Sequence, residues 1–245
     1  MNHFFTEPGN IADGKIYISG SDVNHIKNVL RMKPDEELLI SDGTGKDYLC
    51  RISDINEKEI ICQIISEDVS RTEPTVKFFL FQGLPKADKM EMIIQKSVEL
   101  GVYEIIPVET SRSVVKYDDK KKRSRQERWQ KIAEGAAKQS GRGIIPQVDE
   151  IMSFKNALKM AENLDMILIP YENFKDMKAT RETIASIKPG MSVGIFIGPE
   201  GGFAGNEVDS ATEAGAYQLC LGSRILRTET APLMLLSVLM FALEE

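Results

Sequence analysis

The chain has 245 residues, 42% of them hydrophobic and 28% charged, which is an ordinary globular composition with enough length for two separate cores. Its net charge of −6 argues against a protein that attracts nucleic acid over its whole surface, so such a contact would need a local basic patch. Three widely spaced cysteines and two distant histidines give neither a disulfide framework nor the spacing of metal ligands. We therefore expect a reducing, cytoplasmic setting and no bound metal.

Two segments bear on membranes and targeting. Residues 231–243 are almost wholly apolar, but crossing a bilayer takes roughly 20 such residues. The first five residues lack the basic region and the long apolar core of a signal peptide. We predict a buried or interface helix at 231–243 and no membrane contact.

The first part of the chain is typical of a small β-barrel. Four short segments are strand candidates, and turn signals separate them: 15–18, 37–40, 48–52 and 60–65. Between the first two, residues 21–31 place apolar side chains on one helical face, and Ser21 or Asp22 could cap that helix.

A polar segment that ends in Pro74 marks the domain boundary. Residues 66–74 separate two apolar runs, and the pattern changes after them from hairpins to alternating strands and helices. The sequence therefore predicts one domain at residues 1–70 and another at 74–245.

The second domain reads as an α/β sheet with helices around it. We expect strands at 76–82, 104–108, 166–169, 193–197 and 217–221. We expect helices at 88–100, 124–139, 177–187 and 231–243. Asp88 with Glu91, and Ser124 with Glu127, have the spacing of capping boxes at two helix starts.

Two glycine-rich loops follow neighbouring strands of this sheet. The first is Gly-Pro-Glu-Gly-Gly-Phe at 198–203, and the second runs from Gly222 to Pro232. Loops at the carboxyl ends of parallel strands form ligand sites, although a plain strand-to-helix turn is the simpler interpretation of the first. Neither a Walker pattern nor a GxGxxG motif is present, and the loops offer few cations. Such a lining suits a ligand without a polyphosphate, for instance an adenosine that carries a sulfonium.

The two loops also carry a family resemblance. GPEGGF at 198–203 and LGSRILRTETAP at 221–232 resemble the signature of the RsmE family of ribosomal RNA methyltransferases, in the SPOUT class. The resemblance implies a trefoil-knotted α/β domain around S-adenosylmethionine, a homodimer, and an amino-terminal PUA-like β-barrel that binds RNA. Residues 25–31 resemble the HxxxVLR element of that barrel. The implied reaction is methylation of uracil N3 in 16S ribosomal RNA, near the decoding centre of the small subunit.

The resemblance assigns the cofactor to three loops at strand ends. The implied cofactor-binding residues are Pro170, Tyr171, Glu172, Gly198, Pro199, Glu200, Gly201, Gly202, Leu221, Gly222, Ile225 and Leu226.

A uracil N3 becomes a good nucleophile only as its proton leaves, so the site must stabilise a developing anion. Arg142 resembles the arginine of the first SPOUT motif, and we expect it to position the substrate and stabilise that anion. The alternative is a cation that interacts with a helix carboxyl end. Arg227 and Glu229 complete the predicted catalytic set.

A basic run at 116–131 is the expected RNA-binding patch, with an ordinary solvated helix face as the alternative. Lys89 is a further possible phosphate contact, and Trp129 within the run is predicted to be a packing residue. The predicted RNA-binding residues are Arg31, Lys86, Arg112, Lys121, Lys122 and Arg123.

Two other functions fit the same fold. A related enzyme could methylate another RNA position, such as a ribose 2′-hydroxyl. A non-enzymatic RNA-binding assembly factor could retain the fold without the reaction, but it would have little reason to keep both loops intact.

Overall fold

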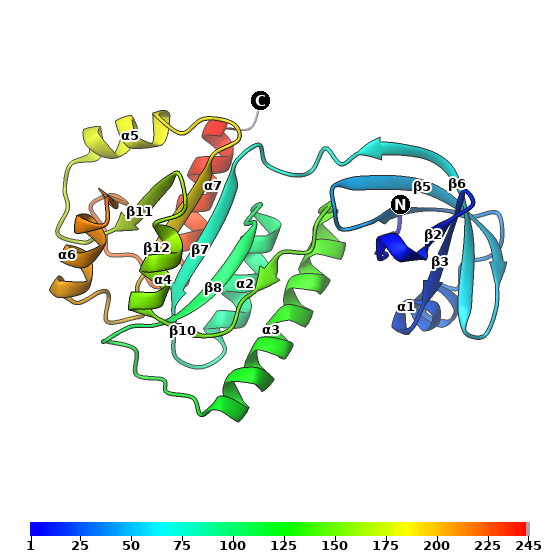
Figure 1. Cartoon of the computed structure of the whole chain (residues 1–245), viewed down its shortest axis with the longest axis horizontal. Helices are drawn as coiled ribbons and strands as arrows, with labels where there is room; N and C mark the ends of the chain where they lie inside the picture. The colour runs from blue at the N-terminus through cyan, green and yellow to red at the C-terminus, as the bar shows by residue number, and fades with distance from the viewer. Residues whose placement is uncertain (244–245) are drawn as a thin grey trace. The chain divides into compact units, whose positions relative to one another are not determined.

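The computed structural model of the protein describes residues 1–243, which form two compact units (Figure 1). The first unit comprises Met1–Glu73 together with Ala137–Ile145. The second comprises Pro74–Ala136 and the chain from Pro146 onward. The first unit therefore consists of two separate chain segments. The single boundary expected between residues 70 and 74 does not include the second segment.

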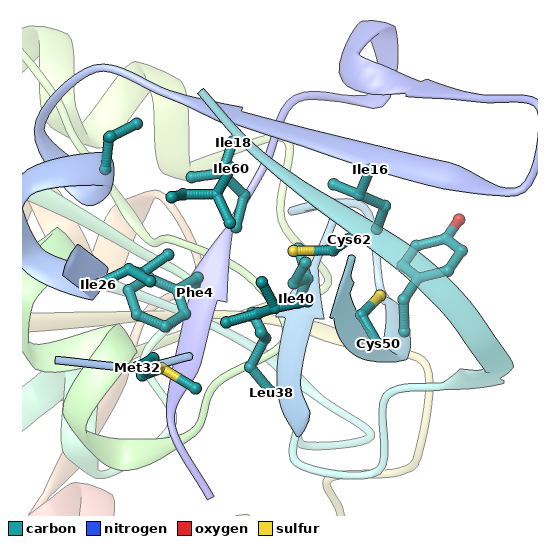
Figure 2. Packing of buried hydrophobic residues seen from close by; sticks show 13 residues of the cluster. Phe4, Ile16, Ile18, Ile26, Met32, Leu38, Ile40, Cys50, Ile60 and Cys62 are labelled. Carbon is teal, nitrogen blue, oxygen red and sulfur yellow. The ribbon is translucent and has the colours of Figure 1, made fainter. Parts of the chain in front are cut away.

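The first unit is built on one six-stranded sheet in the order β1-β4-β5-β6-β3-β2. Its strands are β1 (His3–Phe5), β2 (Ile11–Ala12), β3 (Lys15–Ser19), β4 (Glu37–Ser41), β5 (Lys46–Ile55) and β6 (Glu59–Val69). The pairings are antiparallel except for that of β1 with β4. Buried and more exposed residues alternate along β3, because successive side chains point to opposite faces of a strand. Figure 2 shows the resulting core, with Phe4 and Ile26 packed among the aliphatic side chains of the strands.

The predicted helix of this unit has an irregular end. A 3₁₀ turn at Pro8–Asn10 precedes it in the chain, and α1 (Ser21–Asn24) continues as a π-helical segment at His25–Val29. The predicted cap at Ser21 or Asp22 is wrong: the residue before the helix is Gly20, at φ 73°, where a glycine is favoured. The Asp22 carboxylate instead accepts from the Lys138 ammonium at 3.0 Å.

The second unit contains a sheet in the order β10-β8-β7-β12-β11-β13, with β9 paired to β8, and its strands run parallel. The strands are β7 (Lys77–Gly83), β8 (Glu104–Glu109), β9 (Gln147–Val148), β10 (Met152–Ser153), β11 (Met166–Pro170), β12 (Ser192–Ile197) and β13 (Tyr217–Leu219). β12 lies between β7 and β11, although it follows both in the chain. The carboxyl ends of β12, β11 and β13 therefore meet at one edge.

Helices cover both faces of this sheet, which confirms the predicted α/β class. They are α2 (Lys89–Glu99), α3 (Asp119–Ser140), α4 (Phe154–Ala161), α5 (Met177–Ala185), α6 (Gly205–Glu213) and α7 (Ala231–Leu243). The core against α4 and α6 contains Phe81 and Phe196, which are register partners and whose rings stack at 4.4 Å between centroids. On the other face α7 packs against α2, with Leu236 and Leu239 fully buried.

Neither predicted capping box forms. Asp88 precedes α2 with φ −89° and ψ 13°, outside the extended region, and its side chain makes no cap bond. Glu91 is bound by the Arg128 guanidinium at 2.7 Å. α3 begins before Ser124, at Asp119, where the Asp118 carboxylate accepts from the Lys121 amide at 2.8 Å.

Two other predictions concern single features of the helices. Trp129 is 2% exposed, which confirms its packing role. Within residues 1–243, no helix has both the length and the apolar character that crossing a membrane requires.

Candidate active site

A cavity of about 360 Å³ opens at the carboxyl edge of β11, β12 and β13, within the second unit. Three loops line it: the segment after β11 from Pro170, the glycine loop at Gly198–Gly202, and the segment from Cys220 to Ala231, here called the second loop. The lining is mostly apolar, with a few charged side chains at its margin. This size and lining are those of a small-molecule site.

The glycine loop can form only with its particular residues. A Cβ at Gly198 would lie 2.9 Å from the carbonyl carbon of Gly202, a contact that backbone atoms cannot relieve cheaply. Gly202 has φ +65°, and its amide donates to the Pro199 carbonyl at 2.9 Å. On the other side, a Cβ at Gly83 would meet Pro199 at 2.7 Å. The glycines therefore provide a tight reversal against the end of β7, which an ordinary turn does not need.

A backbone amide and two side chains from neighbouring segments hold the outside of the glycine loop. The Lys86 amide donates to both oxygens of the Glu200 carboxylate, at 3.1 and 3.3 Å. The Lys89 ammonium lies 3.0 Å from the same carboxylate. The Arg112 guanidinium donates to the Gly201 carbonyl at 2.9 Å.

The second loop is joined to the glycine loop by a buried hydroxyl. Thr228 is 4% exposed, and its Oγ1 donates to the Gly198 carbonyl at 2.7 Å. Gln82, which is fully buried at the end of β7, donates to that Oγ1 at 3.0 Å. At the start of the loop the Cys220 amide donates to Thr180 Oγ1 at 2.9 Å. Between these anchors Ile225 is 83% exposed although it lines the cavity.

The loop after β11 completes the third side. The Tyr171 amide donates to the Leu219 carbonyl at 3.0 Å, which extends the pairing of β11 with β13 into the loop. The Tyr171 hydroxyl accepts from Asn173 at 3.0 Å. Backbone pairing and a side-chain bond thus hold the aromatic ring of Tyr171 at the cavity.

One lysine and two carboxylates form a charged cluster at the cavity margin. The Lys89 ammonium lies 3.0 Å from Glu200 and 3.1 Å from Glu229. Hydrogen bonds to the two carboxylates raise the pKa of Lys89. Burial alone would raise the pKa of both glutamates, but bonds from their own amides and from Lys89 outweigh it and lower those pKa values. The cluster is therefore fully ionised at neutral pH, and Glu229 is poorly suited to hold a proton.

Most predicted cofactor-binding residues line this one cavity. Gly201 does not line it, but its carbonyl is the one that Arg112 binds. The cavity lining includes Pro170, Tyr171, Glu172, Gly198, Pro199, Glu200, Gly202, Leu221, Gly222, Ile225 and Leu226.

The predicted catalytic residues belong to different units. Arg227 lines the cavity, and Glu229 is tied to its margin through Lys89. Arg142 belongs to the first unit, is 3% exposed, and binds Glu73 through Nε at 2.9 Å and Nη2 at 2.6 Å. The Gly143 amide donates to the same carboxylate at 2.8 Å. The sequence showed no local sign of this pairing, because Glu73 lies in the linker.

The predicted RNA-binding residues differ in their contacts. Arg31, at φ 55°, and Arg123 are exposed, as is the side chain of Lys86. Lys122 lies 2.8 Å from Glu109, and Lys121 3.8 Å from Asp118, so these two charges are partly compensated on the surface. Arg112 holds the glycine loop, and Lys89 binds two carboxylates.

Comparisons with known proteins agree with this geometry. A family model described as an RNA methyltransferase domain matches residues 72–240, and one described as an RNA methyltransferase PUA domain matches residues 18–65. The chain is 38% identical over 230 residues to ribosomal RNA small subunit methyltransferase E of Bacillus subtilis, covering 93% of this chain and 90% of that protein. It is 28% identical over 243 residues to the Aquifex aeolicus protein of the same name, covering 98% and 99%. A crystal structure of ribosomal RNA small subunit methyltransferase E from Neisseria gonorrhoeae bound to S-adenosylmethionine aligns with a TM-score of 0.83 at 33% identity, over 98% of this chain and 97% of that one.

Proposed function

The chain belongs to the RNA methyltransferase family that includes ribosomal RNA small subunit methyltransferase E, and we propose that it methylates uracil N3 of a uridine in 16S ribosomal RNA with S-adenosylmethionine. The observation that carries the proposal is the single cavity in which the glycine loop, the second loop and the loop after β11 meet. Two of these loops, the glycine loop and the second loop, carry the motifs that resemble the family signature.

The cavity fits the proposed methyl donor. Gly202 and Gly222 line the cavity, and no atom lies within 4 Å of where a Cβ would stand at either residue, so an adenosine can approach the backbone closely there. Leu221, Ile225 and Leu226 offer apolar cover. Tyr171 lines the same space. When bound, S-adenosylmethionine supplies an electrophilic methyl group on a sulfonium. The apolar walls would exclude water and hold the donor in line with its acceptor.

Arg227 is one of the cationic side chains that line the cavity, and it belongs to the predicted catalytic set. Methyl transfer forms a bond from N3 to the methyl carbon while the bond from carbon to sulfur breaks, and the N3 proton must leave. A guanidinium at the cavity stabilises the negative charge that develops on the uracil as that proton departs. The Glu229 carboxylate would balance the positive charge at this margin rather than accept the proton, because its pKa is lowered.

Arg142 keeps its proposed role in substrate positioning and anion stabilisation, and its contact with Glu73 specifies how it could be oriented. A bidentate pair fixes the plane of a guanidinium. An Arg142→Ala variant should lose transfer with cofactor binding retained, whereas Arg142→Lys would keep the charge but lose the bidentate geometry.

We further propose a homodimer through α7, as expected for the class. Met234, Val238 and Phe241 lie at helical spacing on one face of α7 and are 37%, 37% and 92% exposed. A second copy of this chain would cover that face. Phe241→Asp should produce a monomer in light scattering, and the same charge at Ile65, an exposed apolar position in the first unit, should not.

The remaining parts of the proposal rest on the family and on charge. The knotted connectivity, the cytoplasmic location and the small ribosomal subunit as substrate follow from the family resemblance. The first unit and the exposed cations Arg31, Lys86 and Arg123 would bind RNA.

Transfer of labelled methyl groups tests the function. The protein should label small-subunit ribosomal RNA, free or in subunits that lack the modification, and the product nucleoside should be 3-methyluridine. Label in ribose would instead support 2′-hydroxyl methylation. Cofactor binding without transfer to either substrate would contradict the proposed acceptor, and absence of cofactor binding would support the assembly-factor alternative.

A further inference from the structure

An ion cluster at the start of α2 connects two of the three loops that line the cavity. Lys89 is the first residue of α2. A cation at a helix amino terminus is unfavourable to the helix, where acidic residues are preferred. Its position is therefore not explained by helix stability, and its two carboxylate partners provide a different explanation.

Those partners come from different loops of the cavity. Glu200 belongs to the glycine loop, and Glu229 follows the second loop's Thr228. Both contact one nitrogen, at 3.0 and 3.1 Å, and the three side chains are 28%, 29% and 16% exposed. Without Lys89 the two like charges would face each other across the cavity margin and push the loops apart.

A second tie between the same two loops lies deeper. Gln82, near the end of β7, and Thr228 form a buried chain that ends at the Gly198 carbonyl. This tie is neutral and fully enclosed, so its loss should affect the folding of the unit. The tie through Lys89 is charged and partly exposed, so its loss should affect the loops without changing global stability much.

We propose that Lys89 is a positioning residue that holds the glycine loop and the second loop together through Glu200 and Glu229, so that the cavity is formed before any ligand binds. Lys89 itself lines the cavity, and Gln82 and Lys86 bind the same two loops from outside the lining. This differs from the phosphate contact that the sequence predicts for Lys89.

Hydrogen exchange of the ligand-free protein tests the proposal without using its activity. Lys89→Met keeps the length of the side chain and removes its charge. Peptides that cover 198–203 and 221–230 should exchange about tenfold faster, the loss of roughly one charge-assisted bond. Peptides from β7 and β12 should be unchanged, and Lys89→Arg should restore most of the protection.

Lys96→Met is the matched control. Lys96 lies on the same helix and makes an ion pair with Glu99 at 2.7 Å, with its side chain 45% exposed. That variant removes one charge and one ion pair from α2, and loop exchange should remain that of the unchanged protein. Equal acceleration in both variants, or acceleration of every peptide in Lys89→Met, would overturn the proposal.

Glu229→Gln separates the two arms of the cluster and remains informative if Lys89→Met folds poorly. Lys89 would keep Glu200, so the second loop alone should exchange faster. Acceleration of the glycine loop to the same degree, or of neither loop, would contradict the assignment.

A weaker affinity for S-adenosylmethionine in Lys89→Met, by about tenfold, follows only if the proposed function is also correct. Faster loop exchange without any cofactor binding in the unchanged protein would leave this inference standing and overturn the proposed function. Two other groups act on the same cluster: the charge of Arg227, which lowers the pKa of Glu229, and the backbone amide of Lys86, which binds Glu200.

Discussion

The glycine loop and the second loop border one cavity but are held differently. In the glycine loop, the Gly198 carbonyl binds Thr228, the Gly201 carbonyl binds Arg112, and the Glu200 carboxylate binds Lys86 and Lys89. The second loop is anchored near its ends, and Ile225 between the anchors is 83% exposed. The scaffold thus shapes the first loop in advance, whereas the middle of the second loop offers its apolar surface to a ligand.

Because the two loops are held differently, substitutions in them should have different effects on stability and on ligand affinity. A change in the glycine loop or its partners should alter both stability and ligand affinity, because the loop is part of the packed edge of the sheet. A change in the middle of the second loop should alter affinity alone.

The largest effect is expected for Gly198→Ala. The added Cβ would lie 2.9 Å from the Gly202 carbonyl carbon, so the backbone must shift, at a cost of about 1–3 kcal/mol in unfolding free energy. Affinity for S-adenosylmethionine should fall at least tenfold, about 1.4 kcal/mol. Thermal unfolding and titration calorimetry measure both. Gly205→Ala is the control, since nothing lies within 4 Å of its Cβ, and it should bind normally.

Removal of the buried hydroxyl should come next. Thr228→Val leaves the Gly198 carbonyl and the Gln82 amide without their shared partner, which should destabilise the second unit by about 1–3 kcal/mol. Thr228→Ser retains the hydroxyl and should lose much less. Equal unfolding midpoints in denaturant for the two variants would show that the tie between the loops is unimportant.

Ile225→Ser should distinguish the two loops most directly. Because Ile225 is exposed, the unfolding free energy should change by less than about 0.5 kcal/mol. Loss of its apolar cover should weaken cofactor binding by roughly 1–2 kcal/mol, or about tenfold. Val114→Ser removes another exposed apolar side chain, 69% exposed and outside the cavity lining, and should bind as the unchanged protein does.

The smallest effect concerns the opposite edge of the sheet, where β8 begins. Burial, and then the Asp149 carboxylate, raise the pKa of Glu104 to about 7. Because this pKa is higher in the folded state than in the unfolded state, the protonated Glu104 carboxyl stabilises the fold. That stabilisation is fully present below about pH 4.5 and is lost as the pH rises to about 7. Glu104→Gln should remove that slope, worth roughly 1 kcal/mol after solvent screening, from thermal unfolding curves. Cofactor affinity should stay the same, because the site lies at the other ends of the strands.

The buried strands could be predicted because their sequences carry the signal locally. The run at 193–197 is apolar throughout, as a strand covered on both faces must be, and it forms β12. The helix starts could not be predicted in the same way. Glu91 has the spacing of a capping box, but Arg128 from another helix binds it.

In the candidate site, too, the sequence predicts the features that depend on local residues and not those that depend on distant ones. The glycine loop stands out locally, since Gly198 and Gly202 are needed for its own backbone. Gln82 and Lys89 give no such sign, because their contacts depend on β7 lying beside β12, a pairing between residues more than 100 positions apart. The environment of Arg142 likewise depends on a linker residue, Glu73.

The pair of Arg142 with Glu73 has a consequence for cutting the molecule into parts. A fragment of residues 1–73 would end on a carboxylate whose guanidinium and amide partners have been removed, and Asp22 would lose Lys138 as well. RNA-binding assays on such a fragment would therefore measure a damaged module. A fused chain that appends residues 137–145 after residue 73 through a short glycine-serine linker would supply both missing partners.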